Sequence, residues 1–455
     1  MNVFLGVEKF GKIDSARIKI NKFTIFVGNN NSGKTYVMQL IYGVLNEIIK
    51  MRGFHINDLQ DYRQKYNLGN DFFRKLEKQI NDYLENRKEQ IVQNVFHSSI
   101  PIERLYIEFQ NIDETYSVSF KEDVLQFRQT KDFDLASNKV IWANIYHGQE
   151  KISQIGHLKV GLEPELFASS IGNSIIMNIL GISRSNPVHE PILYLPASRT
   201  GILLLYKYFF SEKDQADVGI IQKEPDRKAS RGNLYGLTEP VYRFLQFLLR
   251  YTPDEMNVDL NRDLLEFIES HLIDGQLSQD NENTIYTPKG EKQGIPLYLS
   301  SSMVNELAPL VKVLSGSVDY DYLLYDEIET CLHPSKQGEM ARLLNRLYNA
   351  GMRLIVSTHS DTMAAQMNNL FLLSFLKAPQ EELDKKLEAL KLTKEDLLRS
   401  FDVSVYQFTN DENGISHVEE LPFKRVPYTG YDFPQFTDSA LRVYDDSKKI
   451  VESEA

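Results

Sequence analysis

Cysteine is nearly absent from this sequence: the 455 residues include one, Cys331. A lone cysteine cannot form an internal disulfide, and the first residues lack the basic and then apolar pattern of a signal peptide, so we expect a reducing, cytoplasmic compartment. Long apolar runs are also missing. Residues 201–210 and 370–376 are among the longest, and they fall well short of the roughly 20 residues that a membrane-spanning helix needs. We therefore expect no membrane association.

Positive charge is in the minority, with 51 Lys and Arg against 63 Asp and Glu and a net charge of -12. This balance excludes a protein coated with a basic nucleic-acid-binding surface, so any DNA contact must be local. Hydrophobic residues make up 42% and charged residues 25%, as in ordinary globular proteins, which excludes a disordered or fibrous chain. The length fits about three domains, or one large domain with insertions.

Patterns typical of buried strands and of helices alternate in two parts of the chain. Residues 23–27 form an apolar, β-rich run, after which apolar residues recur at helical spacing over 37–48. The apolar runs 322–325 and 353–357 flank a helical pattern over 335–350. This alternation predicts an α/β fold with a mostly parallel core sheet.

Other segments predict an antiparallel β subdomain and helical insertions. Three short alternating runs favour an antiparallel meander, over 105–109, 116–120 and 124–127. The other stretches have mainly helical patterns, over 71–93, over 200–290 with a polar loop at 275–283, and over 379–400 before a strand at 403–408.

One segment matches the pattern of a phosphate-binding loop, and it lies between a buried strand and a helix, as that pattern requires. Glycine at both ends lets the backbone turn its N–H groups inward, and the helix N-terminus adds positive potential. We expect Lys34 to reach the outer phosphates of ATP and Thr35 to hold a magnesium ion. The whole predicted loop is Gly28, Asn29, Asn30, Asn31, Ser32, Gly33, Lys34 and Thr35.

Two later strands end in candidate catalytic residues. One runs into Asp326 and Glu327, which suit magnesium binding through water and polarisation of an attacking water, respectively. The other leads to His359, whose neutral imidazole suits hydrogen bonding to a terminal phosphate or to that water. Each motif by itself also fits a structural interpretation, as solvent-facing acids or a structural histidine at a strand end.

The order of loop, acid pair and histidine resembles that of the ATP-binding-cassette (ABC) ATPases of the SMC, RecF and overcoming-lysogenization-defect (OLD) group. The resemblance covers about residues 1–50, 95–200 and 290–440. It implies an ABC-ATPase head that binds ATP and Mg²⁺ and hydrolyses ATP.

The same resemblance assigns further nucleotide contacts. A segment around Ser300, Ser301 and Ser302 resembles the signature motif. This implies that it caps the γ-phosphate of the ATP bound to the phosphate loop of a second head. Residues 194–199, which end in Arg199, also resemble a segment of OLD-type ATPases, where an arginine lies close to the nucleotide. Two positions depart from the family: Ser302 stands where glycine is expected, and Ile328 stands where proline is usual.

The resemblance also implies a division of the chain into lobes and insertions. These are an N-terminal lobe with the phosphate loop and a β subdomain (1–50 and 95–200), a helical insertion or short coiled-coil arm (51–94), a second helical insertion (201–290), a C-terminal lobe with the signature-like motif, the acid pair (Walker B) and the switch histidine (291–425), and a tail (426–455).

The partners implied are a second copy in a head-to-tail dimer or a larger homo-oligomer, and a separate effector. OLD-type nucleases carry a C-terminal Toprim domain, which needs a glutamate and a D-x-D pair for metal-dependent cleavage. No D-x-D follows His359, so we expect no nuclease domain in this chain. A stand-alone ATPase of this type implies a partner nuclease or toxin, as in bacterial antiphage defence.

Several alternatives stay open. A DNA-repair or DNA-maintenance clamp would grip DNA directly, through the basic cluster at 223–231, which is otherwise a solvated loop. A transporter subunit ranks last because the usual glycine-rich signature is missing, and an AAA+ ring ATPase would carry a polar sensor in place of His359. Phe10 suits either a contact with adenine or, as we favour, the apolar core.

Overall fold

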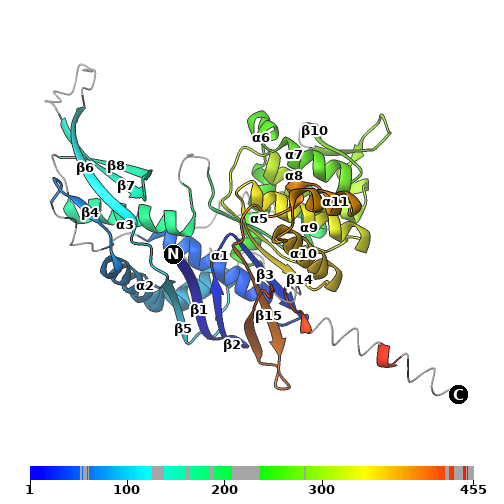
Figure 1. The fold of residues 1–455 in the computed structure, drawn as a ribbon, viewed down its shortest axis with the longest axis horizontal. Coiled ribbons are helices and arrows are strands. Elements are labelled where there is room, and N and C mark those ends of the chain that lie inside the picture. Colours follow the sequence, from blue (N-terminus) through cyan, green and yellow to red (C-terminus); the bar gives the residue numbers. More distant parts are fainter. Residues whose placement is uncertain are drawn as a thin grey trace, which may run out of the picture.

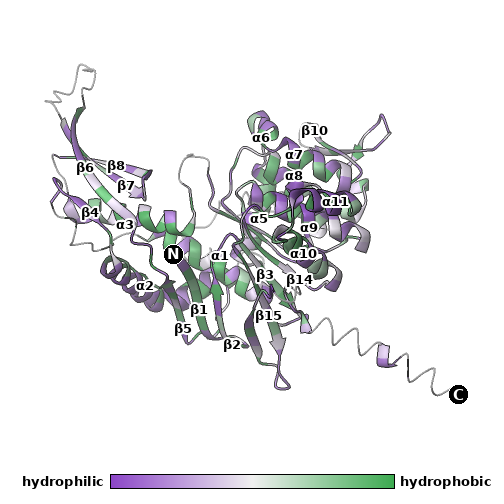
Figure 2. Ribbon diagram, in the orientation of Figure 1, coloured by the Kyte–Doolittle hydropathy of each residue, from purple (hydrophilic) through white to green (hydrophobic). Residues whose placement is uncertain are grey.

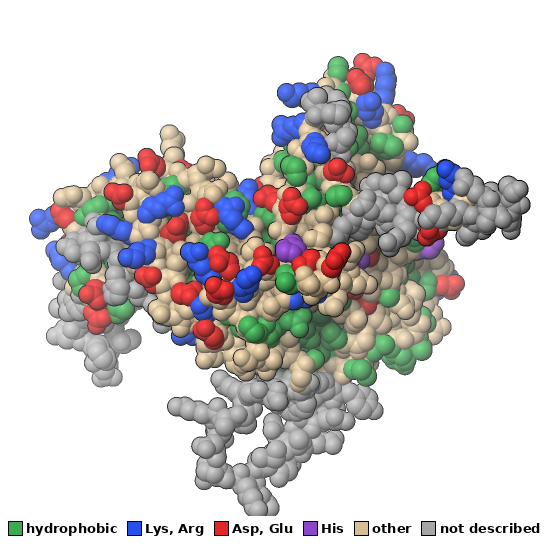
Figure 3. Space-filling model, turned by 90° about the horizontal axis from the view of Figure 1, so that it is seen from below, with side chains coloured by type: hydrophobic (Ala, Val, Ile, Leu, Met, Phe, Trp, Pro, Cys, Tyr) green, Lys and Arg blue, Asp and Glu red, His purple; other side chains and the backbone are tan. Residues whose placement is uncertain are grey.

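The structure is a computed structural model that describes residues 1–51, 54, 59, 61–125, 138–159, 163–183, 189–207, 236–280, 283–425, 430–434, 444–446 and 448. Figure 1 shows a central sheet, a smaller β subdomain beside α2 and α3, and a helical layer at the opposite side. None of the described helices combines the length and the apolar character needed to cross a bilayer. The face drawn in Figure 3 carries acidic and basic side chains in mixed order.

The central sheet has nine strands in the order β5-β1-β2-β16-β15-β3-β14-β13-β9. Strands β15, β3, β14, β13 and β9 pair in parallel, whereas β1, β2 and β5 pair antiparallel at the other edge. This confirms the predicted α/β class with a mostly parallel core sheet. The bounds are β1 Asn2–Phe10, β2 Ile13–Lys19, β3 Phe23–Gly28, β5 Arg104–Gln110, β9 Ile192–Leu195, β13 Tyr322–Tyr325, β14 Arg353–Thr358, β15 Val403–Asn410 and β16 Ser416–Leu421.

Helices cover both faces of the sheet. Successive residues of a strand point to opposite faces, so neighbouring residues of one strand pack against different sets of helices. Tyr322 and Leu324 belong to a core shared with α1, α2 and α3, and Leu323 and Tyr325 belong to a core shared with α5, α8, α9 and α10. The central strands are accordingly apolar along their length (Figure 2). The bounds are α1 Lys34–Lys50, α2 Asn70–Phe96, α3 Pro164–Leu180, α5 Glu239–Arg250, α8 Ser302–Ser315, α9 Pro334–Asn349 and α10 Asp361–Ser374.

The β subdomain corrects the predicted meander. Strand β5 pairs with β1 in the central sheet, and 116–125 form one long strand instead of two. Alternating hydrophobicity identifies a strand but not its partner, and β5 joins the central sheet because its buried side chains face α2. Four strands form the separate antiparallel sheet, β4 Lys65–Asn67, β6 Tyr116–Leu125, β7 Asn138–His147 and β8 Glu150–Leu158, in the order β4-β6-β7-β8.

The predicted polar loop at 275–283 is wrong, because most of it belongs to a small antiparallel sheet. Polar residues alternate there with partly buried ones, so one face of the sheet packs on the protein. The elements of this region are α6 Glu255–Leu260, α7 Arg262–Phe267, a π-helical turn Ile268–Leu272, β10 Gly275–Asp280, β11 Asn283–Pro288 and β12 Ile295–Pro296. The basic cluster at 223–231 lies outside the described residues.

Two other helical predictions are refined. The pattern over 379–400 is a shorter helix, α11 Gln380–Ala389, followed by a 3-10 turn at Lys394–Asp396. Lys391 has a left-handed backbone (φ 56°), which ends the helix. Helix α2 packs along β5, where the Asn81 side chain bonds both backbone groups of Ile107, so this helix lies on the head as an amphipathic helix. The division into lobes and insertions stays a prediction.

Candidate active site

The phosphate loop connects β3 to α1 and needs glycine at both ends. Gly28 has φ 135°, and a Cβ there would lie 2.2 Å from the carbonyl oxygen of Phe408 on β15. Gly33 has φ 92° and directly precedes α1, which begins without a side-chain cap. Because no side chain caps this helix end, its first N–H groups remain available for an anion.

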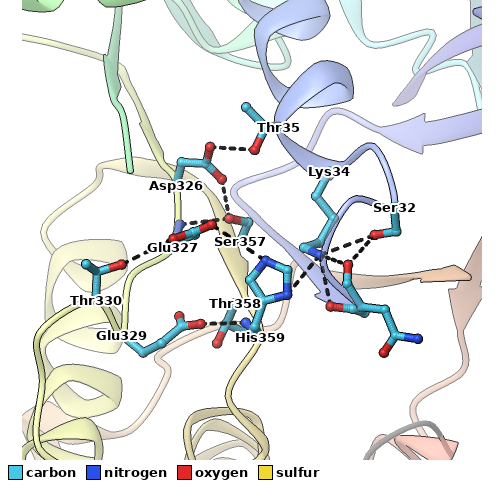
Figure 4. Close-up of polar contacts among 12 residues, drawn as sticks. Ser32, Lys34, Thr35, Asp326, Glu327, Glu329, Thr330, Ser357, Thr358 and His359 are labelled. Carbon is cyan, nitrogen blue, oxygen red and sulfur yellow. Dashed lines mark hydrogen bonds and ion pairs between the residues drawn. The ribbon is translucent and has the colours of Figure 1, made fainter. Parts of the chain in front are cut away.

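Lys34 folds back over its own loop (Figure 4). Its Nζ donates to the carbonyl oxygens of Gly28 (2.9 Å) and Asn29 (2.7 Å) and lies 3.3 Å from Ser32 Oγ. The residue is 4% exposed, and burial lowers the pKa of Lys34 to about 8, although the charges of three nearby acids act in the opposite direction. The ammonium group therefore lies in the loop, where a bound phosphate would replace the carbonyl contacts.

Thr35 contacts Asp326 directly, with Oγ1 donating to Oδ2 over 2.7 Å. The same carboxylate accepts hydrogen bonds from Tyr194 Oη (2.9 Å) and from the hydroxyl of Ser357. Burial, with the charge of Asp326, raises the pKa of Tyr194 well above its usual value, so this phenol stays a donor. A threonine hydroxyl beside a carboxylate supplies hard oxygen ligands of the kind that Mg²⁺ binds together with phosphate and water.

Glu327 adopts a strained backbone with φ 47°, which is rare for a residue with a side chain. Its N–H donates to Ser357 Oγ (2.8 Å), and Oε2 accepts a long hydrogen bond from Thr330 (3.4 Å). The side chain is 39% exposed, so the carboxylate reaches solvent, unlike buried Asp326. The kink thus separates two adjacent acids, one directed at Thr35 and one at the open side of the site.

His359 bridges the loop and the acid pair. Its Nδ1 lies 3.3 Å from Lys34 Nζ, and its Nε2 lies 3.7 Å from Glu327 Oε1. Burial, and then the charge of Lys34, lowers the pKa of His359, so the ring is neutral at neutral pH. The tautomer with its proton on Nε2 accepts from Lys34 at Nδ1 and directs its N–H at Glu327. The backbone N–H of His359 donates to Glu329 Oε1 over 2.6 Å.

Arg199 lies behind the acid pair and is fully buried. Its guanidinium donates to the carbonyl oxygens of Asp326 (2.6 Å) and Glu327 (3.1 Å) and pairs with Glu306 of α8 at 2.8 Å. Arg199 therefore holds the backbone that carries the two acids.

The signature-like segment is at the start of α8 and is exposed. Ser301 is the N-cap, with Oγ accepting from the N–H of Val304 (3.4 Å), and Ser300 Oγ donates to the carbonyl of Leu297. Tyr298 and Leu299 beside it are 66% and 62% exposed. In the described part of the chain, Ser300, Ser301 and Ser302 form side-chain hydrogen bonds among residues 297–305 and one with Thr200.

The structure thus brings one group of predicted residues together and leaves another apart. Lys34, Thr35, Asp326, Glu327 and His359 converge at the carboxyl ends of β3, β13 and β14 (Figure 4). Among the described residues, no hydrogen bond joins Ser300, Ser301 or Ser302 to this group, and Arg199 reaches it only through the backbone of the two acids.

Three contributors were missed by the sequence analysis. Ser357 joins the two acids, Tyr194 donates to Asp326, and Glu329 holds the backbone of His359. Ser357 and Glu329 lie within two residues of predicted catalytic residues, so their proximity was a usable signal. Tyr194 begins the segment that resembles OLD-type ATPases, but only the pairing of β9 with β13 places it beside Asp326. Phe10 is a buried core residue packed against Phe96, as favoured.

A strand, glycine-bounded loop and helix beside an acid pair and a histidine define the site of a P-loop ATPase. Residues 2–174 match the family model of the AAA ATPase domain. No curated protein matches the chain. The geometry of the site and the family match together support a P-loop ATPase, the coarser part of the prediction.

Solved structures with some similarity include SMC heads. A head bound to the C-terminal winged-helix domain of ScpA is 14% identical with a TM-score of 0.38, and the match covers 93% of this chain and 98% of that one. A head with an extended coiled coil from Pyrococcus furiosus, bound to the C-terminal domain of ScpA, is 14% identical (TM-score 0.34, 98% of both chains). The head from Thermotoga maritima is 12% identical (TM-score 0.34, 93% and 100%).

Proposed function

We propose that this protein is a Mg²⁺-dependent ATPase whose ATP-bound heads associate and whose hydrolysis of ATP separates them. The observation that carries the proposal is the contact between Thr35 of the phosphate loop and Asp326 of the acid pair, at 2.7 Å. It joins a phosphate cradle to a metal-binding carboxylate from a strand nearly 300 residues away in sequence. Chance glycine-rich turns do not come with such a partner.

Each residue near the loop then has one task. The uncapped N-terminus of α1 and the loop N–H groups bind the phosphates, and Lys34 exchanges its loop carbonyls for phosphate oxygens. Thr35 and Asp326 would hold Mg²⁺, which neutralises phosphate charge when bound. Tyr194 and Ser357 orient Asp326, so one of its oxygens remains directed at Thr35.

Glu327 and His359 act on the water that attacks the terminal phosphate. The exposed carboxylate of Glu327 accepts a proton from the attacking water, and the strained backbone directs it away from Asp326. His359 is neutral, with its Nε2 proton toward the same position, so it donates a hydrogen bond to the water or the terminal phosphate. Glu329 fixes the backbone of His359 for this contact.

The start of α8 supplies the proposed contact between heads. Ser300, Ser301 and Ser302 are on the surface beside two exposed apolar side chains, Tyr298 and Leu299, which a second copy would cover. Arg199 connects this helix to the acid pair through Glu306. Closure of a second head on α8 can therefore act on the backbone that carries Glu327.

The cellular role that we propose is control of a partner effector, a nuclease or a toxin, in antiphage defence. The family resemblance supports this role, and the net charge of -12 favours a protein partner over extensive DNA contact. The alternative, a clamp that grips DNA directly, depends on the local basic cluster at 223–231.

The decisive experiment uses the variant Glu327→Gln. We expect ATP turnover to fall by roughly 100- to 10,000-fold, because a general base is lost, while ATP binding persists and mass measurement shows a stable dimer or larger homo-oligomer with Mg-ATP. Glu381→Gln, an exposed acid on α11, is the matched control and should behave as wild type. Unchanged turnover in Glu327→Gln would remove Glu327 as the base, and a monomer with bound ATP would overturn the association of heads.

The effector is tested separately. The wild-type protein is purified with its neighbouring gene products, and the mass of the complex reports the partner and the stoichiometry together. A complex that contains a nuclease or toxin supports effector control. Salt-dependent binding of duplex DNA by the isolated protein, with no protein partner, would favour the clamp instead.

A further inference from the structure

A second pocket lies between α8 and the β10–β11 hairpin, away from the phosphate loop. It has a volume of about 230 Å³, and α6 and α7 complete its walls. Its lining is largely apolar, with Leu265, Leu277 and Val311 among the contributors. Pro253, Val258 and Ser278 are exposed, so the pocket opens to solvent on their side. Figure 1 places these elements together in the helical layer.

One lysine points into this pocket. Lys312 is 6% exposed, and its Nζ donates to Thr284 Oγ1 (2.8 Å) and Gln279 Oε1 (3.3 Å) and lies 3.9 Å from the centroid of the Tyr251 ring. All four residues line the pocket. The ammonium group is thus held at a fixed place on the wall by neutral partners.

No acid neutralises this charge in the described part of the chain. Ion pairs there do not include Lys312, and the one acid that lines the pocket, Glu269, contacts Gln276. Burial, and then the positive charge of Lys207, lowers the pKa of Lys312 to about 8. Burying a cation without a counter-ion is costly, and a bound anion would remove that cost.

We propose that this pocket binds a small organic anion, in which a carboxylate or phosphate group pairs with Lys312 and an apolar body packs on Leu265 and Leu277. Small-molecule sites commonly combine an apolar lining with a few fixed polar groups, as here. Lys207 adds a second positive charge: its Nζ is 3.5 Å from Asn283, the residue before Thr284. The site is independent of the phosphate loop, and it does not depend on ATP hydrolysis.

The experiment labels lysines of the full-length protein with pyridoxal 5′-phosphate. This anionic aldehyde condenses with an amine, with loss of water, and borohydride then reduces the imine to a stable product. Peptide mass mapping scores each lysine separately, Lys34 included. We expect Lys312 to react roughly tenfold faster with pyridoxal phosphate than with uncharged pyridoxal, because Lys207 can hold the phosphate while the deprotonated amine of Lys312 attacks the aldehyde, and a charge-assisted contact is worth about that factor. Exposed Lys385 on α11 should not distinguish the two reagents and is the internal control.

Competitors then identify the anion. Butyl phosphate or butyrate should suppress labelling of Lys312 but not of Lys385, and the more effective one shows whether a phosphate or a carboxylate is preferred. Equal labelling by pyridoxal and pyridoxal phosphate, or labelling that neither competitor reduces, overturns the proposal.

A second measurement does not need covalent chemistry. Butyl phosphate or butyrate should raise the unfolding temperature of the wild type and leave that of Lys312→Met unchanged. Methionine has similar length and no charge to bury, so this variant should fold. An equal rise in both proteins would contradict the site.

Discussion

Helices α1 and α8 each carry a buried lysine, yet the surroundings of the two lysines are opposite. Burial lowers the pKa of both Lys34 and Lys312 to about 8. Around Lys34, the charges of Asp326, Glu327 and Glu329 favour the protonated form, whereas the one charge that acts on Lys312 is another cation, Lys207. Lys34 is thus a cation within an acidic site that also needs a metal, whereas Lys312 has no ion-pair partner among the residues that the structure describes.

The N-terminal ends of the two helices differ as well. Helix α1 follows Gly33 and has no side-chain cap, so its N–H groups are free to bind phosphate. Helix α8 follows Ser301, whose hydroxyl already accepts from Val304. A helix end that has its own cap offers fewer donors to a ligand, so the N-terminus of α8 should hold a γ-phosphate more weakly than that of α1 does.

The largest expected effect concerns the ion pair that connects α8 to the acid pair. Arg199→Met leaves Glu306 charged and buried without its partner, which should lower the free energy of unfolding by about 3–5 kcal/mol. Denaturant unfolding measures the loss. The double variant Arg199→Met/Glu306→Leu removes both charges and should recover most of it. If the double variant is no more stable than the single one, the hydrogen bonds of Arg199 to the backbone, and not its charge pair, hold α8 to this region.

The phosphate loop is tested by Lys34→Ala, for which we expect ATP affinity to fall by roughly 100-fold or more, since a buried charge contact with phosphate is lost. Equilibrium binding of ATP with Mg²⁺ measures the change. Lys385→Ala on the surface of α11 is the matched lysine control. If Lys34→Ala keeps its affinity for ATP, the assignment of residues 28–35 as the phosphate-binding loop is wrong.

The two lysines also predict a pH dependence of stability. Between pH 8 and 9.5 each of these lysines is mostly deprotonated in the folded protein. In the unfolded protein the lysine pKa is near 10.5, so the side chain is still protonated there. The unfolded state then binds more protons, so stability rises with pH, by about 2 kcal/mol per lysine over this window. Lys312→Met should lose that rise for one lysine, and it should be more stable than the wild type below pH 8. A slope unchanged by Lys312→Met would show that Lys312 is not desolvated.

The parts of the molecule that were predictable from sequence are those with local signals. The phosphate loop is contiguous, and its helix begins at Lys34 because Gly33 permits the turn. Strands β13 and β14 are continuous apolar runs, so the acids and the histidine at their ends were visible. The unpredictable parts depend on pairing across the sheet: β9 beside β13 puts Tyr194 on Asp326 and Arg199 against the backbone of the acids. Similarly, β5 leaves the predicted meander for a partner 100 residues earlier, β1.

The smallest effect that we predict is at Ser302, the first residue of α8, where the family expects glycine. Ser302→Gly removes the Cβ from an exposed helix end, so a phosphate of a second head can approach the backbone more closely. In the Glu327→Gln background, the ATP-dependent dimer should tighten by about threefold, roughly the value of one weak added contact. Analytical ultracentrifugation measures the dissociation constant, and the unfolding temperature separates this effect from a general weakening of the helix. A weaker dimer with unchanged unfolding temperature would mean that the Ser302 hydroxyl itself binds the nucleotide, so that α8 uses side chains where α1 uses backbone.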